Sequence, residues 1–261
     1  MTASPHSYWP QGMVYGTLLN FKAERAAMAA QMTAPPYKAP PQAPVLFIKT
    51  ANTFNTSGGV IQVPAQVLEI EIGATFGMVI GFIEPVSESN LAQAAPLNIA
   101  NQLAGFVLMN DLSVPHTSFF RPPVKFKCLD GFLGVGLNLI PTALAGDPSE
   151  FRLEVRINGV LKKSVDFSDL HRDALTLLRD VTEFMTLQTG DVLMLGCDAG
   201  RPLGKVGDHI DISAPGLPAF GTLSHTLASE GQFFDVSPLR KSPSSGGSEA
   251  HTVASVGTSF L

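Results

Sequence analysis

Residues 153–165, LEVRINGVLKKSV, place the pair Asn158-Gly159 between two stretches in which apolar and polar residues alternate. Asn-Gly is typical of a two-residue β-hairpin turn, because both turn positions need a positive φ angle. Alternation with a period of two is the pattern of a strand with one buried face. The segment therefore predicts two antiparallel strands joined by a tight turn, so this part of the chain is expected to belong to a β-sheet.

Other apolar runs are also short and are bounded by Gly, Pro, Asn or Asp, as strands usually are. They lie at 45–48, 67–81, 106–109, 192–196 and 208–213. Only two segments favour helices, one after a predicted N-cap at Asn20 and one after a predicted N-cap at Ser168 that runs over 169–187. The prolines of 34–44, APPYKAPPQAP, predict an extended loop. The pattern indicates a mainly β (α+β) fold with a few peripheral helices.

The chain has 261 residues, 45% of them hydrophobic, which is enough for one full core. We predict an N-terminal piece at 1–44 with a strand, a helix and the Pro-rich loop. The central domain should span 45–227, followed by a Ser/Gly-rich tail at 228–261.

Several functional classes are disfavoured by composition. The two cysteines have no C-x-x-C spacing, which disfavours a disulfide framework or a zinc site. A formal net charge of -5 disfavours general binding to nucleic acids. The N-terminus lacks a leader pattern, and no apolar run approaches the ~20 residues that span a bilayer. We expect a cytoplasmic protein with no membrane contact.

Polar residues are concentrated in 105–136, GFVLMNDLSVPHTSFFRPPVKFKCLDGFLGVG. The apolar run 106–109 stops at Asn110-Asp111, and a basic cluster follows that comprises Arg121, Lys125 and Lys127, with Asp130 next to it. A local reversal of charge in an acidic chain suits an anionic ligand. The spacing is equally compatible with Asp111 as a turn cap and the cations as a solvated loop.

NDLSVPHTSFF followed by KFKCLDGFLGVG resembles a motif of the fumarylacetoacetate hydrolase family. The resemblance extends to PPYKAPPQAPVLFIKTANTF, GMVIG, TGDVLMLG and VGDHIDI, and so covers most of the chain. PYKAPP and SFFRPPVKFKCLDGF are most similar to the N-terminal half, or subunit, of the isomerase/decarboxylases of homoprotocatechuate (4-hydroxyphenylacetate) degradation. The resemblance implies a mixed β-roll and carbon–carbon chemistry on 2-oxo acids.

The metal site of the family is altered in this sequence. When GMVIG is aligned with the family, its Glu-x-Glu ligand pair falls on Gly73 and Thr75, which leaves Asp111 as the one matching ligand. We therefore expect no metal or weakly bound Mg²⁺. The alternative is a shifted register in which Glu69 and Glu71 are the ligands.

The family lid is also altered, because Glu24 stands where the resemblance places a His after Leu-Asn. Glu24 is a candidate base or a solvated residue of an alanine-rich helix. The resemblance assigns candidate catalytic roles to Lys127, Asp111, Glu24 and Asp130. Candidate substrate-binding residues are Lys49, Thr75, Arg121 and Lys125, although Lys49 at a strand end is also compatible with a solvent-facing position.

The predicted activity is decarboxylation or isomerisation of a dicarboxylic 2-oxo or 2-hydroxydienoate through an enolate. In this hypothesis Lys127 faces the enolate, Lys49 or Arg121 holds a substrate carboxylate, and Asp111 holds residual metal or orients Lys127. The first alternative is a non-catalytic subunit that pairs with a metal-competent paralogue, and the second is an acylpyruvate hydrolase. The family suggests a homodimer or a heteromer with a paralogous subunit.

Overall fold

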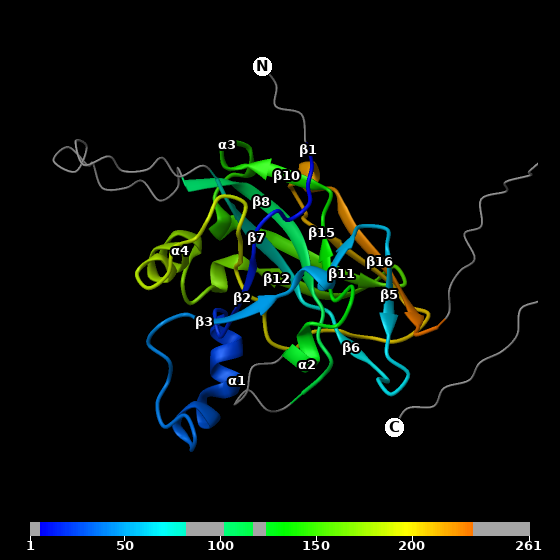
Figure 1. The fold of residues 1–261 in the computed structure, drawn as a ribbon, viewed down its shortest axis with the longest axis horizontal. Helices are drawn as coiled ribbons and strands as arrows, with labels where there is room; N and C mark the ends of the chain where they lie inside the picture. The colour runs from blue at the N-terminus through cyan, green and yellow to red at the C-terminus, as the bar shows by residue number, and fades with distance from the viewer. Residues whose placement is uncertain (1–5, 82–101, 117–123, 232–261) are drawn as a thin grey trace, which may run out of the picture. The chain divides into compact units, whose positions relative to one another are not determined.

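The computed structural model describes residues 6–81, 102–116 and 124–231 (Figure 1). Arg121, most of the segment 85–104 and the tail from residue 232 lie outside the described residues. No helix of the described part is long and apolar enough to cross a membrane.

Strands make up most of the described elements. They are β1 (His6–Ser7), β2 (Val14–Leu18), β3 (Val45–Lys49), β4 (Phe54–Thr56), β5 (Val60–Val63), β6 (Ile70–Glu71), β7 (Ala74–Ile80), β8 (Leu103–Asp111), β9 (Leu133–Val135), β10 (Asn138–Pro141), β11 (Arg152–Ile157), β12 (Val160–Asp166), β13 (Val192–Met194), β14 (Leu203–Gly204), β15 (His209–Ser213) and β16 (Thr222–Ser229). The α-helices are α1 (Lys22–Thr33), α2 (Val124–Lys127), α3 (Thr142–Ala145) and α4 (Ala174–Thr182), and short 3₁₀ helices connect some of the strands.

The larger sheet is built around the antiparallel pair β7 and β8. Its order in the described part is β1-β10-β8-β7-β13-β2-β3, with β9 pairing both β8 and β4. Every residue of β7 is buried, so the sheet is covered on both faces at its centre. The smaller sheet has the order β12-β11-β15-β16-β5, and β6 pairs separately with β14.

The hairpin predicted at Asn158-Gly159 is confirmed. Ile157 pairs with Val160 across the turn, and the two turn residues have φ angles of 51° and 77°. This hairpin, β11 with β12, forms one edge of the smaller sheet (Figure 1).

The main core includes apolar side chains of β7 and β8 together with those of the smaller sheet and α4. Aromatic rings connect these parts, since Phe76 of β7 lies 4.6 Å from Phe151 and 5.0 Å from Phe220 by ring centroid. A second core covers the other face of the larger sheet and includes Val107 and Met109 of β8. Because strand side chains alternate between faces, Asp111 follows Val107 and Met109 on the side of this second core.

Both predicted helices exist, but both predicted N-caps are wrong. Phe21 precedes α1, and the Asn20 amide instead donates to the Leu195 carbonyl at 2.8 Å. Asp173, rather than Ser168, caps the second helix by accepting from the Thr176 N–H. The second helix also starts later than predicted, at Ala174.

The late start of α4 has a physical cause. Leu170 forms an isolated bridge with Phe21, and the His171 N–H donates to the Asn20 carbonyl at 2.7 Å. This main-chain pairing holds residues 170–171 extended, which excludes the helical conformation there. The same pairing also fixes the residues at which α1 begins. This helix lies beside β2 and β3 (Figure 1).

The predicted strand over 67–81 is divided in two. β6 ends at Glu71 and β7 begins at Ala74, with Gly73 between them. Glu71 pairs with Ser113 in an isolated bridge, and the Asp111 N–H donates to the Gly73 carbonyl at 2.8 Å. This junction brings the end of β8 against the start of β7 and positions the candidate site.

Candidate active site

The centre of the site is Asp111, the last residue of β8, whose side chain is 1% exposed. The Lys127 ammonium of α2 donates to Asp111 Oδ2 at 2.6 Å, and the Lys49 ammonium at the end of β3 lies 2.9 Å from Oδ1. Both lysines are almost completely buried as well. Two ammonium groups therefore share one buried carboxylate. If the carboxylate lost its charge, both ammonium groups would be buried without an anionic partner, which is costly.

Lys49 holds the surrounding backbone together. Its ammonium donates to the carbonyls of Leu112, Lys127 and Phe132 at 2.9, 2.6 and 2.8 Å. Burial lowers the pKa of Lys49 to about 8, against the opposing effect of Asp111. Because three carbonyls use the three N–H donors, the contact with Asp111 is ionic, and Lys49 does not line the pocket described below.

A third cation reaches the same carboxylate from the loop between β13 and β14. Arg201 Nη1 lies 3.7 Å from Asp111 Oδ2 and 3.5 Å from Glu71 Oε2. Burial by itself would raise the pKa of Asp111, but Lys127, Lys49 and Arg201 hold it well below its ordinary value. Lys127 and Arg201 both approach Oδ2, so these two cations converge.

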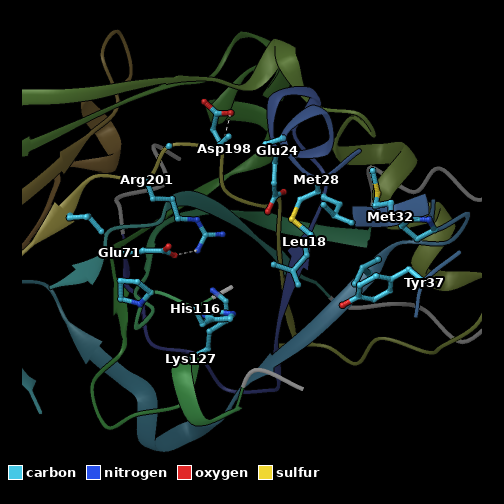
Figure 2. Close-up of a pocket in the computed structure, with 18 of the residues that line it drawn as sticks. Leu18, Glu24, Met28, Met32, Tyr37, Glu71, His116, Lys127, Asp198 and Arg201 are labelled. Atoms are coloured by element: carbon cyan, nitrogen blue, oxygen red, sulfur yellow. Dashed lines mark hydrogen bonds and ion pairs between the residues drawn. The ribbon is translucent and has the colours of Figure 1, made fainter. Parts of the chain in front are cut away.

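Lys127 and Arg201 line one cavity of about 570 Å³, a size typical of small-molecule sites. Figure 2 shows charged and polar side chains around one end of it: Glu71, His116, Lys127 and Arg201. The other end is formed by apolar and aromatic side chains: Leu18, Met28, Met32 and Tyr37. Glu24 points into the cavity between the two ends (Figure 2).

The Glu24 carboxyl is suited to proton transfer. Burial raises its pKa above the ordinary value for a glutamate, while Arg201 and Lys127 act in the opposite direction. Its Oε2 is buried and has no hydrogen-bond partner in the part of the chain that the structure describes. A carboxyl with a raised pKa inside a pocket is a candidate acid or base.

The structure brings together three of the residues predicted from sequence to be catalytic: Asp111, Lys127 and Glu24. Thr75 lies on the same face of the sheet, but it is fully buried and donates to the Gly196 carbonyl at 2.6 Å. Asp130 is exposed and accepts from Asn52 at 2.7 Å.

The other predicted binding residues lie apart from this group. Lys125 is exposed and outside the lining of the cavity, and Arg121 is outside the described residues. Lys49 is internal, as shown above. Asp130 and Lys125 therefore have no place in the cavity lining, and the assignment of Arg121 stays a prediction.

Arg201 and His116 are pocket residues that the sequence did not mark as candidates, whereas Glu71 was predicted only as an alternative metal ligand. Arg201 stands in the segment 200–204, GRPLG, which has no phosphate-loop pattern and belongs to no motif of the resemblance. His116 stands within the resembling motif itself, where its ring stacks on Phe126 with centroids 4.6 Å apart. A side chain in a loop between two strands can be assigned to a site only when the pairing of those strands is known.

The donor set does not fit a divalent metal ion. A Cβ added at Gly73 would lie 2.3 Å from the Asp111 carbonyl oxygen, so a carboxylate side chain has no room there. Thr75 directs its hydroxyl to Gly196, and Asp111 is already surrounded by cations. In the described ranges, no group of three or more His, Cys, Asp or Glu residues is arranged to hold a metal.

Glu69 and Glu71, the alternative pair of metal ligands, do not face one common site. Glu71 lines the cavity beside Arg201, whereas Glu69 is exposed and lines a separate hollow with Lys162 and Lys205. The main chain of Gly73 bonds to Asp111, and Thr75 pairs with Met109 on the same face of the sheet, so Gly73 and Thr75 rather than Glu69 lie toward Asp111.

The family model described as fumarylacetoacetate (FAA) hydrolase C-terminal matches residues 13–228. The chain belongs to this family. The resemblance seen in the motifs is confirmed. A similar protein is the 4-hydroxyphenylacetate degradation bifunctional isomerase/decarboxylase of Salmonella dublin, 34% identical over 223 residues, which are 85% of this chain and 48% of that protein.

A second relative is the homoprotocatechuate catabolism bifunctional isomerase/decarboxylase of Escherichia coli, 32% identical over 208 residues, or 80% of this chain and 46% of the relative. The chain thus spans about half the length of these curated relatives. The solved structure of 5-carboxymethyl-2-hydroxymuconate delta-isomerase from Mycobacterium smegmatis matches with a TM-score of 0.66 and 23% identity, covering 88% of this chain and 83% of that one. The predicted fold, a mixed β-roll of the fumarylacetoacetate hydrolase type, is confirmed.

Proposed function

We propose that the chain catalyses isomerisation or decarboxylation of a 2-oxo or 2-hydroxydienoate acid through an enolate, using side-chain cations at the position where the family is expected to use a metal. The observation that carries this proposal is the convergence of Lys127 and Arg201 on one oxygen of Asp111 at the polar end of the cavity. The names of the family relatives support this class of reaction.

Both reactions place negative charge on the oxygen of the 2-oxo group. In isomerisation a proton leaves one carbon, the electron pair moves onto this oxygen, and a proton is returned to another carbon. In decarboxylation the bond to the departing carboxylate breaks, carbon dioxide leaves, and the same oxygen receives the electron pair. Cations fixed beside that oxygen stabilise the enolate, because they are oriented before the charge develops.

The described residues divide these tasks among themselves. Lys127 and Arg201 face the oxyanion and the neighbouring carboxylate of the substrate. Asp111 is a positioning residue, because its carboxylate holds Lys127 at 2.6 Å, and Lys49 in turn holds Asp111. Glu24 takes and returns the proton at the carbon next to the oxyanion.

The test is hydrogen–deuterium exchange at the carbon next to the 2-oxo group, followed by proton NMR with 2-oxobutanoate in deuterated buffer containing EDTA. This exchange reports enolate formation without requiring the natural substrate. We expect exchange well above the rate of buffer alone. A rate equal to that of buffer would contradict the proposal.

Glu24→Gln is expected to reduce this exchange by about 10²–10⁴-fold, the usual contribution of an acid or base. A raised pKa means that Glu24 keeps its proton to a higher pH than an ordinary glutamate. If Glu24 is the base, the exchange rate must rise as pH increases through that pKa, and this limb must be missing in Glu24→Gln. Glu150→Gln, at an exposed position, is the control. Persistence of the same pH limb in Glu24→Gln would remove Glu24 from the mechanism.

A second candidate function is that of a subunit that pairs with a metal-competent paralogue. It is favoured by the donor set, which does not fit a metal, and by the match to only about half the length of the relatives. In that case the chain alone would show no exchange, and a co-purified paralogue carrying Glu-x-Glu would restore it. Exchange by the chain alone favours the first candidate.

A further inference from the structure

The cavity has two chemically different ends, and the proposed enolate chemistry uses only one of them. At the polar end, Lys127 and Arg201 approach Asp111. At the opposite end, Figure 2 shows Leu18, Met28, Met32 and Tyr37. We infer that the ligand is amphipathic: a 2-oxo or 2-hydroxy acid with one carboxylate at the cationic end and an apolar tail at the methionine end. This inference rests on the proposed function and specifies its substrate class. It restricts the reaction to isomerisation, because a single bound carboxylate leaves none to depart, and it replaces the dicarboxylic substrate that the sequence resemblance implies.

The charges of the polar end suit a single carboxylate. Lys49, Lys127 and Arg201 are the cations, while Asp111 and Glu71 are the anions in contact with them. Among these five groups one positive charge is in excess, and it stays uncompensated while Glu24, whose pKa is raised by burial, keeps its proton. A carboxylate beside Lys127 and Arg201 balances this excess next to the almost completely buried Lys127–Asp111 pair, where an unbalanced charge is costly.

Among the described residues that line the apolar end, none is a cation that could pair with a second carboxylate. Among the described residues that line it, the hydroxyl of Tyr37 is the polar group. Carboxylates are rarely buried without a partner, because the lost hydration is not replaced. An alkyl or aryl tail, in contrast, gains from contact with Met28 and Met32, whose flexible thioethers adapt to different shapes.

Helix α1 connects the two ends. Glu24, Met28 and Met32 are spaced four residues apart on α1, so they lie along one face of the helix. That face directs the Glu24 carboxyl into the middle of the cavity and the two methionines toward the apolar end (Figure 2). A second carboxylate in the tail would also approach Glu24, and the two like charges repel once Glu24 has lost its proton.

The experiment compares two ligands of the same length by isothermal titration calorimetry in EDTA: 2-oxooctanoate, with an apolar tail, and 2-oxooctanedioate, with a second carboxylate. We expect 2-oxooctanoate to bind at least tenfold more tightly. Met28→Lys places a cation at the apolar end, so it should weaken 2-oxooctanoate at least tenfold and strengthen the dicarboxylate. Ala26→Lys, an exposed position on the opposite side of α1, should leave both affinities unchanged.

The possible results separate this inference from the proposed reaction. Equal or tighter binding of 2-oxooctanedioate by the natural chain would overturn the amphipathic ligand and leave the cationic end intact. Absence of binding by either ligand would also overturn it. Preferential binding of 2-oxooctanoate without any hydrogen–deuterium exchange would support the inference and contradict the proposed reaction.

Discussion

Asp111→Asn is expected to destabilise the fold by about 3 to 5 kcal/mol, the usual cost of removing one partner from a buried ion pair. The substitution conserves volume but leaves the ammonium groups of Lys49 and Lys127 buried without their carboxylate. Because the free energy of unfolding of a domain is about 5–15 kcal/mol, much of the stability would be lost. Urea denaturation followed by circular dichroism measures the change.

Two further variants make this result specific. Asp169→Asn, at an exposed position, controls for loss of a carboxylate and should change stability by less than about 0.5 kcal/mol. Adding Lys127→Met to Asp111→Asn removes one unpaired charge, so the double variant should lose less stability than the sum of the single losses. Strict additivity would show that the two side chains are not coupled.

Lys127→Met is expected to reduce catalysed hydrogen–deuterium exchange by about 10²–10³-fold, the usual cost of losing one oxyanion donor. The fold should persist, because Lys49 continues to balance Asp111 and methionine fills a similar volume. The lost packing of the ammonium over the Phe47 ring, 4.5 Å from its centroid, should cost little stability. Lys162→Met, on the exposed surface of β12, is the control. Exchange at the natural rate in Lys127→Met would exclude Lys127 from the oxyanion site.

Local sequence patterns predicted the strands well, because each pattern is decided by near neighbours. The hairpin at Asn158-Gly159 needs only two residues with positive φ and alternating flanks, and the structure contains it. Helix ends were predicted less well. Asn20 and Ser168 are good capping residues by type, but a tertiary contact between Phe21 and Leu170 decides how the chain runs there.

The candidate site was predictable where a motif or a strand end marked it. Asp111 and Lys127 stand in the family motif, and Glu24 was found by its place after Leu19-Asn20. Arg201 could not be found in this way, because its position depends on the pairing of the loop after β13 with the end of β6, where the Ile72 N–H donates to the Pro202 carbonyl at 2.9 Å. The internal role of Lys49 was equally hidden, since the three carbonyls it binds come from separate segments.

We propose that Lys127 and Arg201 hold the enolate without a metal ion. Isothermal titration calorimetry with oxalate, which resembles the enolate of a 2-oxo acid, measures whether these two cations bind such an anion without a metal. We predict one-to-one binding in EDTA, no gain when EDTA is replaced by Mg²⁺, and loss of binding in Lys127→Met. Binding that requires Mg²⁺, or tight binding of Mg²⁺ by the chain alone, would contradict the claim and favour a metal-dependent enzyme.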